Sequence, residues 1–344
     1  MQINHWAYQY PKLGISGQFK AAPEDFQVTE NLGYEPIGEG EHIYLWVRKT
    51  GLNTAYLAEK IAKFTQLPLR AVTYAGRKDK HAQTEQWFSV HLPGKGEFDW
   101  TKFNESGAEV LKSIRHNKKL RTGVLKGNYF NITLRQLSST TGLEARLQQV
   151  AEQGVPNYFG EQRFGDTRYD PRGGNLVLAN KMIDGENIRN RNKRSMAISA
   201  LRSWLFNEIV HSRLQEGSLN KLQSGDVMQL AGSNSFFCAE HIDDTLLERL
   251  QAKDIFISAP LWGTGPLASQ HKAQQFEQSV ATKHPNVTRI LEALGLKQER
   301  RAIQLFPADL IWSISDDCLN LEFSLPSGTF ATSVLRELLD IQKS

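Results

Sequence analysis

Asp79 is the acidic residue whose neighbours point most directly to chemistry. It lies in the run GRKDKH at positions 76–81, where a carboxylate is enclosed by cations in a short polar segment. Aspartate is a habitual turn former, and the residue could simply stabilise a turn with a solvated basic rim. Alternatively, the neighbouring positive charge keeps a partly desolvated carboxylate ionised. A carboxylate of that kind could act as a nucleophile or as a general base.

A second candidate group combines an amide with aromatic side chains. The run KGNYF at positions 126–130 holds Asn128, which offers one donor and one acceptor and could read the edge of a uracil base. Phe130 in the same run, Phe26 after the turn at 23–25 and Phe330 after the turn at 326–328 could meet a substrate. Each is equally open to a core interpretation, because aromatic side chains are usually buried for their area.

Two clusters of basic residues stand out from a nearly balanced chain. There are 41 Lys and Arg against 37 Asp and Glu, so the net charge of +4 permits nucleic-acid binding without requiring it. Residues 112–126 contain no acidic residue and include the loop cations Lys118, Lys119, Arg121 and Lys126. The helix cations are Arg189, Arg191, Lys193 and Arg194. The helix cations could simply form a solvated helix face. Alternatively, both clusters could bind the phosphates of a nucleic acid.

The run NYFGEQRFG at positions 157–165 mixes aromatic residues, amides and a cation. That mixture suits RNA contacts by stacking and hydrogen bonding, and it suits ordinary loop packing equally well.

Short strands and one helix are expected around Asp79. Residues 26–30 and 42–48 have the composition and alternation of strands, and residues 53–64 have apolar residues at helical spacing after Asn53, a plausible N-cap. Residues 71–75 and 86–91 are β-prone and flank the polar run, which predicts that Asp79 lies in a loop between two strands.

The composition changes near residue 155 and changes back near residue 307. A strand at 131–135 and a helix at 142–153 precede the change, and helical patterns such as 195–214 then predominate. A strand at 319–325 and a helix from 331 to about 340 follow. A chain of 344 residues suggests about two domains. We therefore expect an α+β catalytic domain interrupted by a helix-rich insertion.

Several classes of protein are disfavoured by what the sequence lacks. A hydrophobic fraction of 40% is ordinary for a folded domain, and no run of about 18 uncharged apolar residues suggests a membrane span. Cys238 and Cys318 are the two cysteines and lie far apart in the sequence, which favours a reducing cytosol. There is no P-loop, no HExxH motif and no metal-ligand spacing among the histidines, so no metal site is expected.

Taken together, these segments resemble the TruD family of tRNA pseudouridine synthases over nearly the whole chain. The run GRKDKHAQTEQ at 76–86 is similar to the family's G-x-K-D-K-x-A-x-T-x-Q signature. Further matches occur in the family's order and comprise PEDF at 23–26, LKGN at 125–128, VPNYFGEQRFG at 155–165, NKRS at 192–195 and GTFATSVLRE at 328–337.

The resemblance implies a fold, an activity and roles for individual residues. It implies a pseudouridine-synthase core with a mixed or antiparallel sheet, formed by residues 1–154 and 305–344, and an α/β, helix-rich insertion at 155–304. It makes Asp79 catalytic and puts Phe26, Asn128 and Phe330 around the target nucleoside, with Phe130 beside them. The family also needs a basic partner for its aspartate, and Lys20 is the candidate because it closely precedes Phe26.

The implied substrate is uridine-13 in the D-stem region of tRNA. The reaction needs no cofactor, and the protein is expected to be monomeric and cytoplasmic. We expect the loop cations, the helix cations, Lys78 and Lys80 to bind RNA. The alternative is an RNA-binding or tRNA-remodelling protein that keeps these surfaces and has lost the chemistry.

Overall fold

The structure is a computed structural model that describes residues 1–3, 5–167 and 170–343. The chain divides into two compact units. The sheet unit comprises Leu13–Ala151, Pro307–Ala331 and Leu338–Ser344, and the helical unit comprises Met1–Lys12, Glu152–Phe306 and Thr332–Glu337. The helical unit therefore joins the middle of the chain to two short terminal segments. The predicted division at residues 155 and 304 stays a prediction.

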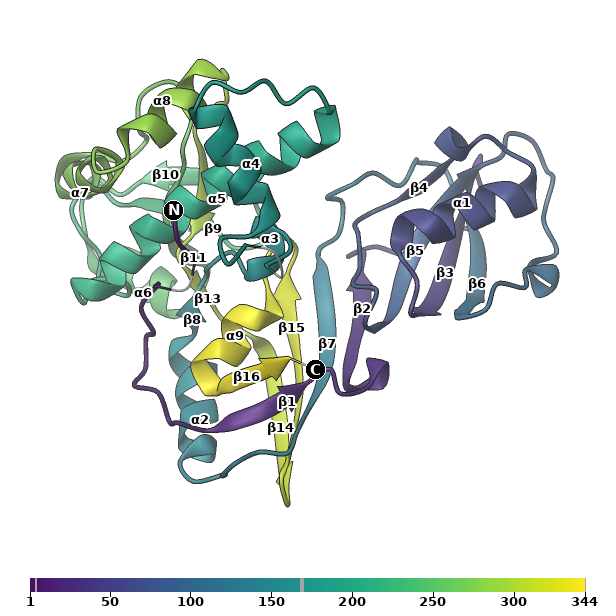
Figure 1. The fold of residues 1–344 in the computed structure, drawn as a ribbon, viewed down its shortest axis with the longest axis horizontal. Coiled ribbons are helices and arrows are strands. Elements are labelled where there is room, and N and C mark those ends of the chain that lie inside the picture. Colours follow the sequence, from purple (N-terminus) through teal and green to yellow (C-terminus); the bar gives the residue numbers. More distant parts are fainter. Residues whose placement is uncertain (4, 168–169, 344) are drawn as a thin grey trace. The chain divides into compact units, whose positions relative to one another are not determined.

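A ten-stranded mixed sheet organises the sheet unit (Figure 1). Its main order is β14-β15-β7-β2-β5-β3-β6, with β1 against β7 and β16, and β4 against β5. Its strands are β1 Ser16–Phe19, β2 Phe26–Asn31, β3 His42–Thr50, β4 Val72–Tyr74, β5 Gln83–His91, β6 Ala108–His116, β7 Gly127–Arg135, β14 Ala308–Ser315, β15 Cys318–Pro326 and β16 Asp340–Lys343. Its helices are α1 Thr54–Thr65 and α2 Leu143–Gln153, whose last two residues belong to the helical unit, with short 3-10 turns at Pro23–Asp25, Leu69–Ala71 and Trp100–Lys102. Helix α9 Ala331–Leu338 lies in the helical unit except for its two end residues.

The two ends of the chain share this sheet. β15 runs antiparallel to β7, and β16 pairs in parallel with β1. The sequence could not establish this joining, because strand pairing across 182 intervening residues for β7 and β15, and 320 for β1 and β16, leaves no local signal. The predicted α+β class with a mixed sheet is confirmed.

Alternation along β3 explains why α1 covers one face of the sheet. Ile43, Leu45 and Val47 are buried against Leu57 and Ile61 of α1, which recur at helical spacing. Figure 1 shows α1 lying across β5 and β3. Asn53 is the N-cap residue, as predicted, although its side chain makes no capping hydrogen bond. On the opposite face, Tyr44, Trp46 and Trp87 pack with Leu120 and Leu125 of the loop before β7.

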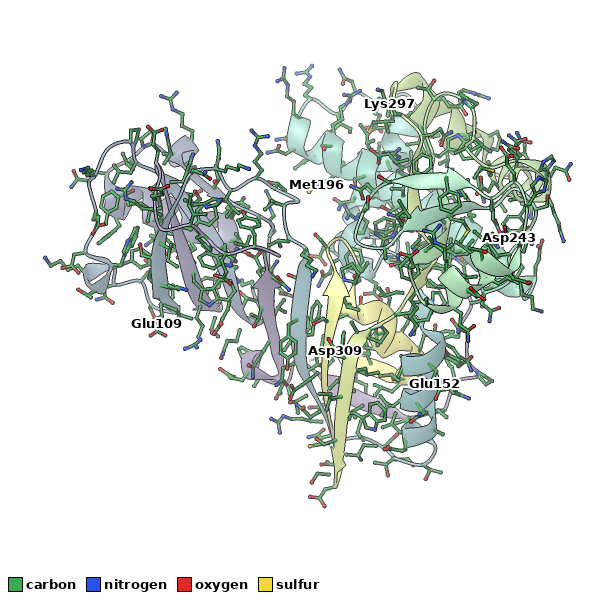
Figure 2. All side chains as sticks on the ribbon, turned by 180° about the vertical axis from the view of Figure 1, so that it is seen from behind. Glu109, Glu152, Met196, Asp243, Lys297 and Asp309 are labelled. Atoms are coloured by element: carbon green, nitrogen blue, oxygen red, sulfur yellow. The ribbon has the colours of Figure 1, made fainter. Side chains whose placement is uncertain are left out.

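The helical unit surrounds the long helix α5. Its helices are α3 Glu161–Phe164, α4 Gly174–Ile183, α5 Arg191–Gln215, α6 Asp244–Gln251, α7 His271–Ala281 and α8 Pro285–Ala293. β9 Val227–Leu230, β10 Phe236–Cys238, β11 Ile255–Leu261 and β12 Glu299–Ala302 form a sheet in the order β10-β9-β11-β12, and β8 Val155–Pro156 pairs with β13 Gln304–Leu305. Figure 2 shows long nitrogen-tipped side chains around the end of α5 that carries Met196.

The helices and strands expected from the sequence are present. β2, β3, β4, β5, β7, β15, α1, α2 and α5 all overlap the predicted segments. The final helix ends at Leu338 rather than near residue 340, because the chain turns there to add β16 to the sheet. Among the described residues, no helix has both the length and the apolar character needed to cross a bilayer.

Candidate active site

Asp79 lies in the loop between β4 and β5, as the sequence predicted. Its Oδ1 accepts a hydrogen bond from the backbone N–H of His81 at 2.9 Å, which is the local turn that aspartate favours. Its Oδ2 forms an ion pair and hydrogen bond with Nζ of Lys20. The turn and the cation-paired carboxylate, which the sequence offered as alternatives, are therefore both present in one residue.

Lys20 is held in an unusual conformation at this site. Its φ is +62°, in the left-handed region that side-chain-bearing residues seldom adopt. Nζ lies 4.3 Å from the ring centroid of Phe26 and 5.0 Å from that of Phe19, so two aromatic faces meet the ammonium that Asp79 binds. Such backbone strain persists where its surroundings fix it, and it is common at functional sites.

The environment of Asp79 keeps its carboxylate ionised. Burial by itself would raise the pKa of Asp79, since desolvation penalises the charged form. The hydrogen bond and charge of Lys20, with the backbone N–H of His81, outweigh burial and hold the pKa below its ordinary value. At neutral pH the site therefore offers a negatively charged oxygen in a partly desolvated setting.

Buried polar side chains hold the backbone of the Asp79 loop. Nζ of the fully buried Lys49, on β3, donates to the backbone oxygen of Asp79 at 2.8 Å. Thr54, at the start of α1, accepts from the backbone N–H of Lys78 at 3.0 Å and donates to the side-chain oxygen of Gln86 at 3.0 Å. Burial lowers the pKa of Lys49 to about 8, although Asp79 raises it in part. These bonds define the position of the loop backbone at Asp79.

A second buried pair holds the residue next to Asp79. Nζ of Lys78 lies 2.7 Å from Oε1 of Glu30 on β2, and Oε2 of Glu30 accepts from the backbone N–H of Trp87 at 2.8 Å. Burial raises the pKa of Glu30, and the charge of Lys78 opposes that shift. The side chain of Lys78 is only 9% exposed. Its predicted contact with RNA stays a prediction, and such a contact would require this ion pair to open.

Phe26, Asn128 and Phe130 lie on one face of the sheet, on the adjacent strands β2 and β7. The ring centroids of Phe26 and Phe130 are 6.1 Å apart, and Asn128 pairs in register with Glu30. Both phenylalanines are buried, which agrees with the core interpretation of each. Within the part of the chain that the structure describes, the buried Oδ1 of Asn128 has no hydrogen-bond partner. A substrate N–H would satisfy that acceptor.

The turn that carries Phe330 lies beside the start of β7. The backbone N–H of Ser327 donates to the oxygen of Lys126 at 3.2 Å, and Leu325 pairs in register with Asn128. Gly127 permits this approach, because a Cβ there would lie 2.4 Å from the backbone oxygen of Leu325. The structure thus brings the segment of Phe330 to the segment of Asn128. The contact of Phe330 with a substrate stays a prediction.

The remaining predicted RNA-binding residues are accessible to solvent. Lys80, the four loop cations and the four helix cations are all exposed. The helix cations lie just before and within the first turn of α5, where Asn190 caps the helix by accepting from the N–H of Lys193 at 3.0 Å. Cations are unfavourable at a helix N-terminus because of the helix dipole. An external anion would relieve that cost.

Sequence reasoning missed Lys49, Glu30 and Thr54 as parts of the site. Lys49 continues the alternation of Ile43, Leu45 and Val47 on the buried face of β3, so a lysine at an apolar position was a usable signal. No group of three or more His, Cys, Asp or Glu residues within the described ranges is arranged to hold a metal ion.

Comparisons with known proteins relate this chain to one family. The sequence model of the family tRNA pseudouridine synthase D (TruD) matches residues 2–185 and 187–338. The tRNA pseudouridine synthase D of Pseudoalteromonas atlantica is 62% identical over 99% of this chain and 98% of its own. The tRNA pseudouridine synthase D of Aeromonas hydrophila is 48% identical over 99% of this chain and 96% of its own.

One solved structure also has the same fold. It is a candidate tRNA pseudouridine synthase D from Methanosarcina mazei, which superposes with a TM-score of 0.71 at 22% identity and covers 97% of this chain and 95% of its own. The match of a family model along nearly the whole chain, together with relatives of high identity, means that this chain belongs to the tRNA pseudouridine synthase D family.

Proposed function

We propose that this protein converts uridine-13 of tRNA to pseudouridine, with Asp79 as the catalytic nucleophile or base. The observation that carries the proposal is the ionised, partly buried carboxylate of Asp79, paired with Lys20 over the ring of Phe26. The family and the names of the relatives support tRNA as the substrate.

The reaction breaks the N1–C1′ bond of uridine, turns the freed uracil and forms a C5–C1′ bond. The proton at C5 is lost and N1 gains one, so the product is an isomer and no electrons enter or leave. Asp79 could add to the nucleoside or remove a proton from the ribose. Both routes need a carboxylate rather than a carboxylic acid, which is the form that Lys20 stabilises.

A uridine within folded tRNA must leave its stack before Asp79 can reach the sugar. The exposed loop cations and helix cations would supply the phosphate contacts that account for much of the affinity, and the buried acceptor of Asn128 would bind the extruded base. We further propose that the protein acts as a monomer in the cytoplasm, where its free cysteines Cys238 and Cys318 would stay reduced.

The decisive experiment compares wild type with Asp79→Asn on unmodified tRNA transcripts. Wild type is expected to form pseudouridine at position 13, and the amide variant should form none while binding tRNA within a few-fold of wild type, because it keeps the shape of Asp79 and removes its reactivity. Pseudouridine formed by a folded Asp79→Asn protein would remove Asp79 from this role. Pseudouridine at another position would refute the assignment of uridine-13.

A further inference from the structure

A cavity of about 570 Å³ opens where β2 and β5 part. The two strands pair in register as far as Thr29 and Glu85. At the next residue of β2, the side-chain carboxylate of Glu30 accepts a hydrogen bond from the backbone N–H of Trp87 on β5. This bond takes the place of backbone pairing between the two strands. The cavity has the volume of a small-molecule binding site.

Four aromatic side chains line this cavity. Trp46 and Trp87 are paired across β3 and β5 with ring centroids 4.9 Å apart, and Trp87 is almost fully buried. Tyr34 and Tyr129 remain 37% and 38% exposed. Partly exposed aromatic rings around a hollow are what an unpaired base stacks on, and stacking tolerates any base because each base has a π face. The ring of Tyr34 is itself backed by the stacked ring of His116.

The side chain of Tyr129 lies on the other face of the sheet from the groups that would bind the target uridine. Tyr129 follows Asn128 and precedes Phe130 on β7, so its side chain points to the opposite face of the sheet. It shares that face with Thr29, its register partner on β2. A base that stacks on Tyr129 therefore belongs to a different nucleotide from one held by Asn128.

Positive charge borders the cavity on the side of the loop before β7. Gly33, a lining residue with φ +79°, lies so close to Lys126 that a Cβ on it would be 2.9 Å from the Cβ of Lys126. The hydroxyl groups of Tyr34 and Tyr44 are 3.3 Å apart, and Tyr44 donates to the backbone oxygen of Lys118 at 3.0 Å. The cavity wall and the loop cations are thus parts of one packed structure.

We propose that this cavity binds one unpaired nucleotide of the RNA substrate, other than the target uridine. Its base would stack on Tyr34 and Tyr129, and its phosphate would lie toward Lys126. The carboxylate of Glu35, an exposed residue of the cavity lining, would repel phosphate and accept from a base N–H group. This orients the base inward and the phosphate toward the cations. The inference rests on the proposed function because it takes the ligand to be RNA.

The test measures RNA affinity in variants that remove the exposed rings. In Tyr34→Leu/Tyr129→Leu, binding of unmodified tRNA transcript should weaken about fivefold or more, since stacking contributes about 1–3 kcal/mol per base. Tyr129→Phe keeps the ring and should bind like wild type. Tyr56→Leu removes a tyrosine that is 39% exposed on α1 and controls for the loss of any surface tyrosine.

A second measurement does not depend on the folding of variants. Ultraviolet cross-linking of wild type to the transcript, followed by mass spectrometry, should find a nucleotide adduct on peptides containing Tyr34 or Tyr129. Wild-type affinity in the double variant, or the absence of any adduct on these peptides in a cross-linked complex, would overturn the cavity proposal. If wild type isomerises uridine-13 while either result is obtained, only this inference fails. If wild type binds no tRNA, the proposed function fails first.

Discussion

Replacing Lys49 with methionine tests two things separately: whether Lys49 positions Asp79 in the candidate active site, and how Lys49 affects the free energy of unfolding. Lys49 is fully buried, and its ammonium donates to the backbone oxygen of Asp79. Methionine has a similar length and leaves that oxygen without its donor. We expect Lys49→Met to lower kcat on the order of 100-fold, since a misplacement of about 1 Å in a catalytic group has effects of that size. Binding of tRNA should change by no more than a few-fold, because Lys49 is inaccessible to RNA.

The contribution of Lys49 to the free energy of unfolding depends on pH in a defined direction. Burial lowers the pKa of Lys49 from 10.5 to about 8, so the folded protein binds fewer protons than the unfolded chain between these values. The cost of burying the charge is full below about pH 8, falls as pH rises and is absent above 10.5. The shift corresponds to at most about 3 kcal/mol, and about 1–2 kcal/mol after solvent screening.

The methionine variant escapes this cost and loses a hydrogen bond of about 1 kcal/mol. Near pH 7 the two effects nearly cancel, so wild type and variant should have similar free energies of unfolding. Near pH 10 most of the burial cost is gone, so the lost hydrogen bond predominates and the variant should be less stable than wild type by up to about 1 kcal/mol.

Urea unfolding of both proteins from pH 7 to pH 10 measures this difference. Lys63→Met, which removes an exposed lysine of α1, is the matched control and should track wild type at every pH. Parallel stability curves for wild type and Lys49→Met would refute a depressed pKa at Lys49. A normal kcat in Lys49→Met would refute its role in positioning Asp79.

Two further predictions concern the base and the backbone of the RNA. Asn128→Ala and Phe330→Ala should each lower kcat more than they weaken tRNA binding, because these side chains would meet only the extruded base. Single-turnover assays measure the first effect and filter binding the second. Much weaker binding with normal turnover at saturation would contradict this prediction. Neutralising the loop cations or the helix cations should weaken tRNA binding and flatten the log-log salt dependence by about 0.7–0.9 per lost phosphate contact, with turnover of bound tRNA little changed. A wild-type salt dependence in both variants would show that the two clusters are solvated surface and do not bind RNA.

The sequence predicted the local elements of the sheet unit better than their assembly. Alternation along β2 and β3 and the helical spacing of α1 reflect burial on one face, which single segments reveal. The parallel pairing of Ser16 with Asp340 could not be predicted, since β1 and β16 are short and nothing local specifies their partner. The four-stranded sheet of the helical unit was not located within its predicted α/β class, because β9 and β10 have only four and three residues.

The candidate site divides in the same way. Asp79 could be proposed from its run of residues, and Lys20 from the family resemblance; the structure shows the two paired. The support beneath them was missed because Lys49 and Glu30 look like ordinary surface charges when each is considered alone. Only their positions in the alternation of β3 and β2 mark them as buried.

Burying Lys49 and Glu30 carries a cost that an apolar pair would avoid, so their presence needs a physical reason. An apolar side chain at position 49 could not satisfy the backbone oxygen of Asp79, which would then have to turn toward water and take the loop with it. Lys49 and Glu30 each bind a specific backbone group, the oxygen of Asp79 and the N–H of Trp87, and Glu30 also holds Lys78. A loop fixed by such directional bonds has few alternative positions, whereas apolar packing would tolerate several. The cost of burying these charges is therefore offset by directional bonds that define the position of the Asp79 carboxylate beside Lys20.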